Sequence, residues 1–372
     1  WLLPNKEKEN CNVYYCGRYE KKSWISKIAN WIFAGGKLAY NSDVTENIIS
    51  KIRDINPDII HLHNLHGDFE YGMIDIPMLF EFLAKIDKEI IWTFHDCWPI
   101  TGRCYHFEYK KCDKWRTGCG NCPQRLYDRE GIFIDRSRQN WIKKKELYSK
   151  LNNLTIVTVS RWLENVVKES MLGNNRCLTI YNGIDVDAFR IIENDEKHDK
   201  FRILCIGWDR RKGYKDYYKL SKLLKGDEEI IVVGRRPVFR KFKRMPDNIR
   251  EIDRASSKEE MASIYKQADI YFNASLAETF GLTTVEALSS GLPVVGYNCT
   301  ATPEIINFFN NGICVDRGDV EMAYQALLKL KNIGKSTDGN KKCKEKFSIE
   351  KMVGSYFQLY MNALPNDKEI ID

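Results

Sequence analysis

One stretch, residues 273–293, limits the folds open to this chain more than any other. It follows a short apolar run at residues 270–272 and passes through a glycine loop into a segment from Thr283 with helical character. A strand, a loop and a helix in this order leave free backbone N–H groups at the start of the helix, and these attract an anion such as a phosphate. Helix, turn and short apolar strand also alternate elsewhere in the chain, which predicts an α/β fold with parallel sheets.

Two carboxylates bracket this loop. Glu278 precedes Gly281, and Glu286 lies eight positions further on, in the second turn of the expected helix. Because Gly281 has no Cβ, the backbone there can approach a ligand closely. A pair of glutamates at this spacing is by itself more often solvated or capping, but the residues around this pair favour a functional role.

The run Glu-Thr-Phe-Gly-Leu-Thr-Thr-Val-Glu-Ala-Leu, with Gly-Leu-Pro-Val-Val after it, closely resembles the E-x7-E signature of retaining, nucleotide-sugar-dependent glycosyltransferases of family 4. The resemblance spans residues 47–363 and is strongest over 201–310. It implies the GT-B fold, in which two Rossmann-like domains face each other across a cleft. It also implies that the helix over residues 349–363 crosses back to the first domain.

Length and charge agree with this expectation. A chain of 372 residues suggests two domains, which we place at residues 1–165 and 166–348, followed by a returning segment at 349–372. The 58 Lys and Arg exceed the 51 Asp and Glu by seven, a balance that suits a nucleotide diphosphate or an anionic membrane surface. No apolar run is long enough to predict a transmembrane helix, and no nucleic-acid partner is expected.

The start of the chain departs from the family pattern. Family members begin with a strand and a glycine-rich loop, and no such stretch precedes Asn47, so we expect the first strand to be missing. No signal peptide is visible. Apolar residues recur at helical spacing over residues 24–32, which indicates a helix packed on the domain core or, alternatively, one facing a membrane or the acceptor.

Histidines follow two strands expected in the first domain. His63, Asn64 and His66 come after the strand that starts at residue 59, and His95 follows the strand over 90–94. Ligands of doubly wound sheets bind at these carboxyl ends, so the first three are candidates for the acceptor side. The resemblance places a histidine such as His95 beside the donor sugar, and Asp96 is expected to orient its ring.

A cysteine-rich insert occupies residues 97–123. Cys104, Cys112, Cys119 and Cys122 have the spacing C-x7-C-x6-C-x2-C, and four thiolates with one C-x2-C pair suit a structural zinc ion. His106 or Cys97 could replace one ligand, and a reduced or disulfide-bridged loop without metal stays open. A similar insert occurs in a polysaccharide-biosynthesis branch of the family, where we expect it to shape the acceptor side. No catalytic metal is expected, because protein would fill all four positions.

The second domain carries the donor contacts that the resemblance implies. Lys212, with Arg210 or Arg211 in place of a family arginine whose position is occupied by Trp208, would hold the diphosphate. Glu286 would bind ribose hydroxyls, and Glu278 would bind the sugar. Catalytic roles fall to His95, Glu278 and Lys212. The remaining donor contacts expected are Arg254, near the base, and Phe280, Gly281, Leu282 and Thr283.

These expectations converge on a retaining glycosyltransferase of bacterial surface polysaccharide synthesis. It would transfer a sugar from a nucleotide diphosphate sugar, with UDP favoured, to a lipid-linked or oligosaccharide acceptor, in the cytoplasm or at the inner face of the cytoplasmic membrane. One alternative is a catalytically idle GT-B relative that binds a partner in an assembly complex. An NAD-dependent oxidoreductase is a poorer alternative, because no G-x-G-x-x-G follows an early strand.

Overall fold

The computed structural model of the chain describes residues 38, 42–66, 74–125, 134–190, 199–236 and 244–364. In these ranges ten strands form two separate parallel sheets, of four and six strands. The chain divides into two compact units: unit 1 holds residues 1–157, 166–178 and 362–372, and unit 2 holds residues 158–165 and 179–361. The amphipathic pattern expected over residues 24–32 lies outside the described residues.

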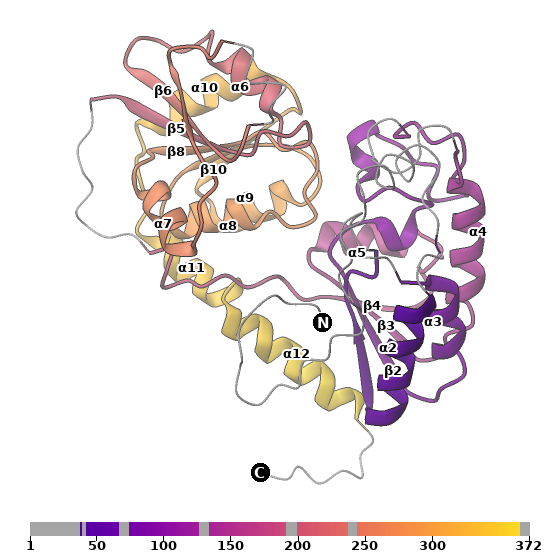
Figure 1. The fold of residues 1–372 in the computed structure, drawn as a ribbon. Coiled ribbons are helices and arrows are strands. Elements are labelled where there is room, and N and C mark those ends of the chain that lie inside the picture. Colours follow the sequence, from indigo (N-terminus) through magenta and orange to yellow (C-terminus); the bar gives the residue numbers. More distant parts are fainter. Residues whose placement is uncertain are drawn as a thin grey trace. The chain divides into compact units, whose positions relative to one another are not determined.

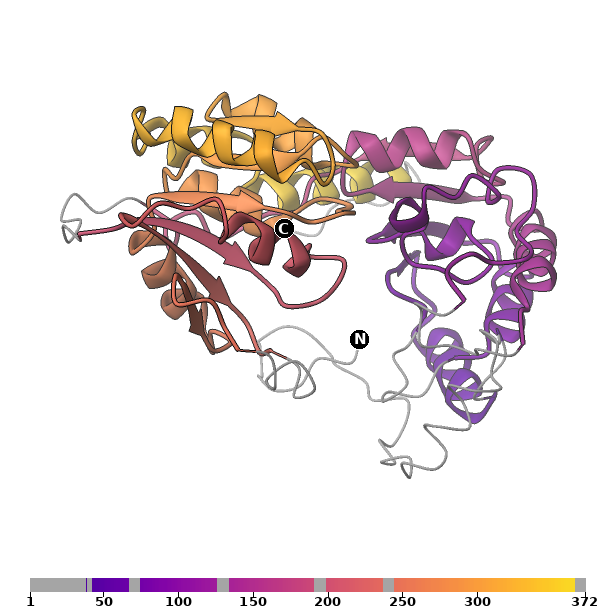
Figure 2. The same cartoon turned by 90° about the horizontal axis from the view of Figure 1, so that it is seen from above.

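The sheet of unit 1 has the strand order β1-β2-β3-β4. Ile90, Ile91, Trp92 and Phe94 of β2 are all buried, as a central strand covered on both faces requires. Helices α2, α3 and α4 lie side by side against this sheet (Figures 1 and 2). The bounds in this part of the chain are α2 Ser42–Ile55, β1 Ile59–Leu62, α3 Ile76–Leu83, β2 Glu89–Phe94, α4 Ser137–Tyr148, β3 Leu154–Thr158, α5 Arg161–Lys168 and β4 Arg176–Thr179.

Between β2 and α4, the described part of the cysteine-rich segment contains only two short 3-10 helices, η1 Trp98–Ile100 and η2 Phe107–Lys110. A buried lysine of α4 holds this segment. The Lys144 ammonium donates to the carbonyl oxygens of Trp98, at 2.6 Å, and Thr101, at 2.9 Å, and lies 3.3 Å from the centre of the Trp98 ring. A buried ammonium is tolerated only with such partners, so Lys144 fixes where the segment leaves β2.

The sheet of unit 2 has the order β10-β9-β8-β5-β6-β7, and each neighbouring pair is parallel. The elements are β5 Phe201–Ile206, α6 Tyr214–Leu220, β6 Glu228–Val233, β7 Ile249–Ile252, α7 Lys258–Lys266, β8 Ile270–Asn273, α8 Leu282–Ser289, β9 Val294–Tyr297, α9 Thr302–Phe309, β10 Gly312–Val315, α10 Val320–Lys331, α11 Asp338–Lys346 and α12 Ile349–Ala363. This is the doubly wound arrangement in which ligands bind at the carboxyl ends of the strands.

Alternation along the strands divides the core of unit 2 into two layers. Ile203 and Cys205 of β5 pack with Leu327 of α10 in one buried cluster, to which α6 also contributes. Since successive side chains of a strand point to opposite faces, Leu204 belongs to the other face, where α8 and α9 lie (Figure 1). Both faces of the sheet are therefore covered.

Helix starts in unit 2 follow their capping residues, with one departure from expectation. Ser257 accepts a hydrogen bond from the amide of Glu260 and caps α7. The sequence Thr302-Pro303 suggests Thr302 as the N-cap of α9, but Ala301 takes that position and Thr302 is the first helical residue. Because Ala301 already has right-handed helical backbone angles, the turn starts one residue earlier.

Candidate functional site

The glycine loop of unit 2 brings together two residues that are far apart in the sequence. The Lys212 ammonium donates to Oε1 of Glu278 at 2.5 Å. The Glu278 side chain is 14% exposed and that of Lys212 is 31% exposed, so the pair is reachable from solvent without being fully solvated. Glu278 lies in the loop that leads into α8 Leu282–Ser289. The Lys212 ammonium paired with it is suited to exchange this carboxylate for an anionic ligand.

The start of α8 has the backbone that the sequence predicts. Gly281 precedes the helix with φ of 95°, in the left-handed region that other residues adopt only at a cost, and no side chain caps this end. Phe280 is buried against Phe347, so only its backbone can face a ligand. Leu282 is exposed, whereas the Thr283 hydroxyl lies 3.0 Å from that of Tyr271.

Glu286 lies on the same helix, and its carboxylate is half-buried. The Tyr265 hydroxyl donates to Oε2 of Glu286 at 2.8 Å. Burial raises the pKa of Glu286, against the opposing effects of this hydrogen bond and of the Lys212 charge. Tyr265 is a site residue that the sequence analysis missed, although its place at the end of an expected helix was visible.

Asp209 shapes the turn that carries the three basic residues. Its Oδ1 accepts the backbone N–H groups of Arg211, at 2.7 Å, and Lys212, at 3.0 Å. The turn closes at Gly213, whose φ is 75° and where a Cβ would lie 2.1 Å from the carbonyl oxygen of Ala274. The turn therefore packs directly on the end of β8, and Arg210 and Arg211 remain exposed.

Trp208 occupies the position where the family pattern has an arginine. Its side chain is buried, and the guanidinium of Arg236, at the end of β6, lies over its ring at 5.9 Å from the centre. Arg236 also pairs with Glu251 at 3.1 Å. The sequence analysis missed Arg236, since no local motif marks it.

Two further residues complete the surroundings of the loop. Thr300 has φ of 53°, an unusual value for a β-branched residue, and its hydroxyl accepts the Glu278 amide at 2.9 Å. It therefore fixes the backbone of Glu278. Arg254 is exposed in the turn between β7 and α7.

The histidines of unit 1 gather at the carboxyl ends of β1 and β2. Nδ1 of His63 lies 3.0 Å from Nε2 of His95. The rings of His61 and His63 are tilted by 42° with their centres 4.1 Å apart, and Nε2 of His61 forms a hydrogen bond with the Thr93 hydroxyl. Burial and the neighbouring histidine charges lower the pKa of His63 to about 3 and that of His61 to about 4. Burial likewise lowers the pKa of His95. All three rings are thus neutral near pH 7.

Asp96 does not orient His95 as expected; it binds His66 instead. Oδ2 of Asp96 lies 2.6 Å from Nε2 of His66, and its Oδ1 accepts the Trp98 amide at 2.7 Å. Burial would raise the pKa of Asp96, but His66 and the amide hold it below its usual value. His95 and Asp96 follow β2 in a bend, where the His66 ring and the Trp98 amide hold the Asp96 carboxylate. Asn64 is exposed.

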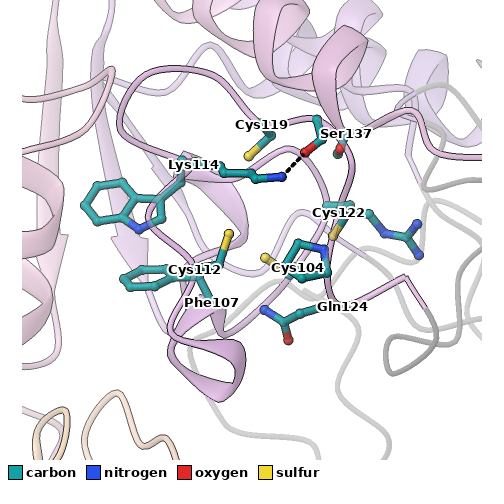
Figure 3. Close-up of a pocket in the computed structure, with 12 residues that line it drawn as sticks. Cys104, Phe107, Cys112, Lys114, Cys119, Cys122, Gln124 and Ser137 are labelled. Atoms are coloured by element: carbon teal, nitrogen blue, oxygen red, sulfur yellow. Dashed lines mark hydrogen bonds between the residues drawn. The ribbon is translucent and has the colours of Figure 1, made fainter.

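The four cysteines singled out in the sequence line one small cavity in unit 1 (Figure 3). Across the described ranges, no three histidine, cysteine or carboxylate side chains already form a group that could hold a metal ion. None of the described helices combines the length and the apolar character needed to cross a lipid bilayer.

Two parallel α/β sheets, each in its own compact unit, are the architecture of the GT-B fold, and the predicted fold class is confirmed. Residues 187–346 match the family model described as glycosyl transferases group 1. The match covers the Lys212 turn, the Glu278 loop and Glu286.

Individual proteins similar to this chain agree. The putative colanic acid biosynthesis glycosyl transferase WcaC of Escherichia coli K12 is 25% identical over 347 residues, which are 87% of this chain and 82% of that protein. Among solved structures, sucrose-phosphate synthase from Thermosynechococcus elongatus has a TM-score of 0.64 at 15% identity, over 86% of this chain and 77% of that one. HepE from Anabaena, solved in complex with UDP, has a TM-score of 0.61 at 11% identity, over 86% and 82%. These two likenesses show the fold.

Proposed function

We propose that the chain is a retaining glycosyltransferase of polysaccharide biosynthesis whose donor is a nucleotide diphosphate sugar. The observation that carries this proposal is the Lys212–Glu278 pair beside the uncapped start of α8, inside the segment that matches group 1 glycosyltransferases. A fixed cation and a helix start are the two features that a departing diphosphate needs, and neither requires a metal.

The donor contacts that we propose all belong to unit 2. The diphosphate takes Lys212 from Glu278, with Arg210 or Arg211 from the same turn, and frees the Glu278 carboxylate for sugar hydroxyls. Glu286, already held by Tyr265, accepts the ribose hydroxyls. In this proposal the amides of residues 280–283 bind sugar oxygens, and Arg254 borders the base. In unit 1, neutral His95 stabilises the reacting sugar carbon.

The finer assignments extend what the relatives suggest. UDP is the favoured nucleotide, because HepE binds UDP in its solved structure. Likeness to a putative colanic acid glycosyl transferase favours a lipid-linked or oligosaccharide acceptor at the cytoplasmic membrane face, with His63, Asn64 and His66 on the acceptor side. Net retention is the stereochemistry proposed.

Calorimetric titration of the chain with UDP and GDP tests the donor site. We expect one nucleotide to bind, and Lys212→Ala and Glu286→Ala each to weaken it at least about tenfold, the loss expected for a charged hydrogen bond. Lys341→Ala, a change at an exposed lysine of α11, is the matched control and should bind as the wild type does.

Incubation of the wild type with UDP-sugars and an oligosaccharide acceptor then distinguishes an active glycosyltransferase from a catalytically idle relative. Release of UDP, with the α-configured donor giving an α-linked product by NMR, supports retaining transfer. Absence of nucleotide binding in the wild type would overturn the donor site. Nucleotide binding without any release of UDP would favour the idle relative.

A further inference from the structure

Four cysteines that the proposed reaction does not use share one cavity in unit 1. Cys104, Cys112, Cys119 and Cys122 all line it, and every described cysteine of the chain is a free thiol. Figure 3 shows the four sulfur atoms around a common space, with Phe107 beside them. Trp115 also lines this cavity. The two aromatic rings are buried and lie 4.7 Å apart, so they keep one wall of the cavity dry.

The size of this cavity limits what can occupy it. Its volume is about 10 Å³, which is room for about one water-sized sphere. A nucleotide, a sugar or a lipid headgroup is far too large, whereas a single ion fits. Four sulfur ligands select a soft divalent cation with tetrahedral geometry, and zinc is the common one.

The backbone around Cys119 and Cys122 is shaped as a turn that can present two sulfurs to one ion. Gly120 has φ of 150° and Asn121 has φ of 44°, which reverses the chain between the two cysteines. The Gly102 amide donates to Sγ of Cys119 at 3.2 Å, and the Lys114 ammonium donates to the carbonyl oxygens of Gly120 and Asn121, each at 3.0 Å. Such contacts orient metal ligands from outside the coordination sphere.

Positive charge surrounds the cavity as a thiolate cluster requires. Four thiolates and one divalent cation carry a net charge of −2. Arg103, which is buried, and Lys114, which is exposed, line the same cavity. These two cations offset part of the excess negative charge.

We propose that Cys104, Cys112, Cys119 and Cys122 bind one structural zinc ion. When the ion binds, the four thiols lose their protons to solvent, and no redox change is involved. In the structure the sulfurs line the cavity without yet being arranged around one point, so rotation about the Cα–Cβ bonds of the cysteines accompanies binding. The ion then ties η2 and the Cys119–Cys122 turn together, in a segment whose described residues form no strand or α-helix.

Metal analysis of the full chain, purified under reducing conditions and dialysed against metal-free buffer, tests this directly. We expect about one zinc per chain, the stoichiometry of a closed four-ligand site. Titration of the wild type with a mercurial reagent should release the zinc in proportion to thiols modified. Replacement by Co²⁺ should give the intense visible bands of tetrahedral thiolate coordination, a readout independent of activity.

Variants assign the ligands. Cys112→Ser and Cys122→Ser should each lower the zinc content and weaken the cobalt bands. Cys177→Ser removes a half-buried thiol of β4, in the same unit but away from the cavity, and should leave both unchanged. If a serine variant fails to fold, the mercurial and cobalt titrations of the wild type still decide the question.

Three results would overturn the proposal. The first is wild-type protein that takes up neither zinc nor cobalt with its thiols reduced. The second is peptide mapping that finds these four cysteines paired in disulfides in freshly isolated protein. The third is a loss of metal in Cys177→Ser as large as in the cavity variants.

Discussion

Glu286 is a half-buried carboxylate whose environment disfavours its charge. Its pKa is raised from 4.5 by burial, so the stability that this group contributes is fully present below pH 4.5 and is lost as pH rises through the folded-state value. At neutral pH the ionised Glu286 therefore lowers the stability of the chain without nucleotide. Hydrogen bonds from a ribose bound at Glu286 would offset this loss. Active sites commonly keep such a cost.

We predict that Glu286→Gln raises the thermal stability of the nucleotide-free chain at pH 7.5 and weakens nucleotide binding by about tenfold or more. The neutral amide keeps the shape and loses the desolvated charge. Thermal unfolding from pH 4 to pH 8 and calorimetry measure the two effects. Glu345→Gln, at an exposed position of α11, should change neither, and a destabilised Glu286→Gln chain would contradict the argument.

The histidine cluster of unit 1 has the opposite sense of pH dependence to Glu286. For His61 and His63 the folded-state pKa values, about 4 and about 3, lie below the usual 6.5. Their contribution is fully present above pH 6.5 and is lost as pH falls toward those values, because the unfolded chain takes up protons first.

We therefore predict that stability to urea declines between pH 6.5 and pH 4, and that His63→Asn makes this decline shallower. The substitution removes one group whose protonation is disfavoured in the folded chain. It also removes the repulsion that protonated His63 would exert on protonated His95, whose Nε2 lies 3.0 Å from Nδ1 of His63. Urea midpoints at pH 7.5, 6 and 5 measure the slope, with pH 7.5 as the internal reference. Equal slopes in the two proteins would show that His63 is not one of the titrating groups.

At the scale of elements, the turn after β5 depends on its contact with β8. At Gly213 a side chain would have to adopt a positive φ and would also meet the Ala274 carbonyl. Gly318 has φ of 86°, and an added Cβ there would meet no other atom. An alanine at this position therefore has only the free-energy cost of the left-handed backbone. The two glycines thus form a matched pair.

We predict that Gly318→Ala destabilises the chain by about 1 kcal/mol, the cost of left-handed backbone, and leaves nucleotide binding intact. Gly213→Ala should cost more, because the turn must also move away from β8, and it should weaken nucleotide binding by displacing Lys212. Denaturant unfolding and calorimetry of both variants give the comparison. Equal effects on stability and binding would show that the contact with β8 does not position Lys212.

The elements show where the sequence was informative. Strand β5 and helix α12 have the predicted bounds, because a continuous apolar run and a long periodic pattern leave little choice. Strands β4 and β7 were not predicted. Both are short and only partly buried, and their pairing depends on neighbours in the sheet that no local pattern reveals.

The site divides in the same way. Glu278, Gly281, Glu286 and Lys212 stand out because glycine and charge mark them locally, and the structure joins Lys212 to Glu278. Contacts between segments distant in the sequence could not be predicted, such as the hydrogen bond from Tyr265 to Glu286 or the pairing of Asp96 with His66. These partners are chosen by packing, not by spacing.

At the scale of the whole molecule, the chain holds two cores that each surround their own sheet. The proposed nucleotide contacts of Lys212, Glu278 and Glu286 all belong to unit 2, and the proposed zinc ligands all belong to unit 1. A ligand that binds only the folded form of one unit stabilises that unit by mass action, by about 2.7 kcal/mol at a concentration of 100 times its dissociation constant.

We predict that differential scanning calorimetry resolves two transitions and that the nucleotide raises only one of them. Limited proteolysis at temperatures between the two midpoints should identify the nucleotide-sensitive unit as residues 179–361, since fragments of that unit would persist only with nucleotide present. Lys212→Ala is the control, because its transition should no longer respond. A single transition that the nucleotide shifts as a whole would show instead that the two cores unfold together, and the binding energy would then stabilise the entire chain.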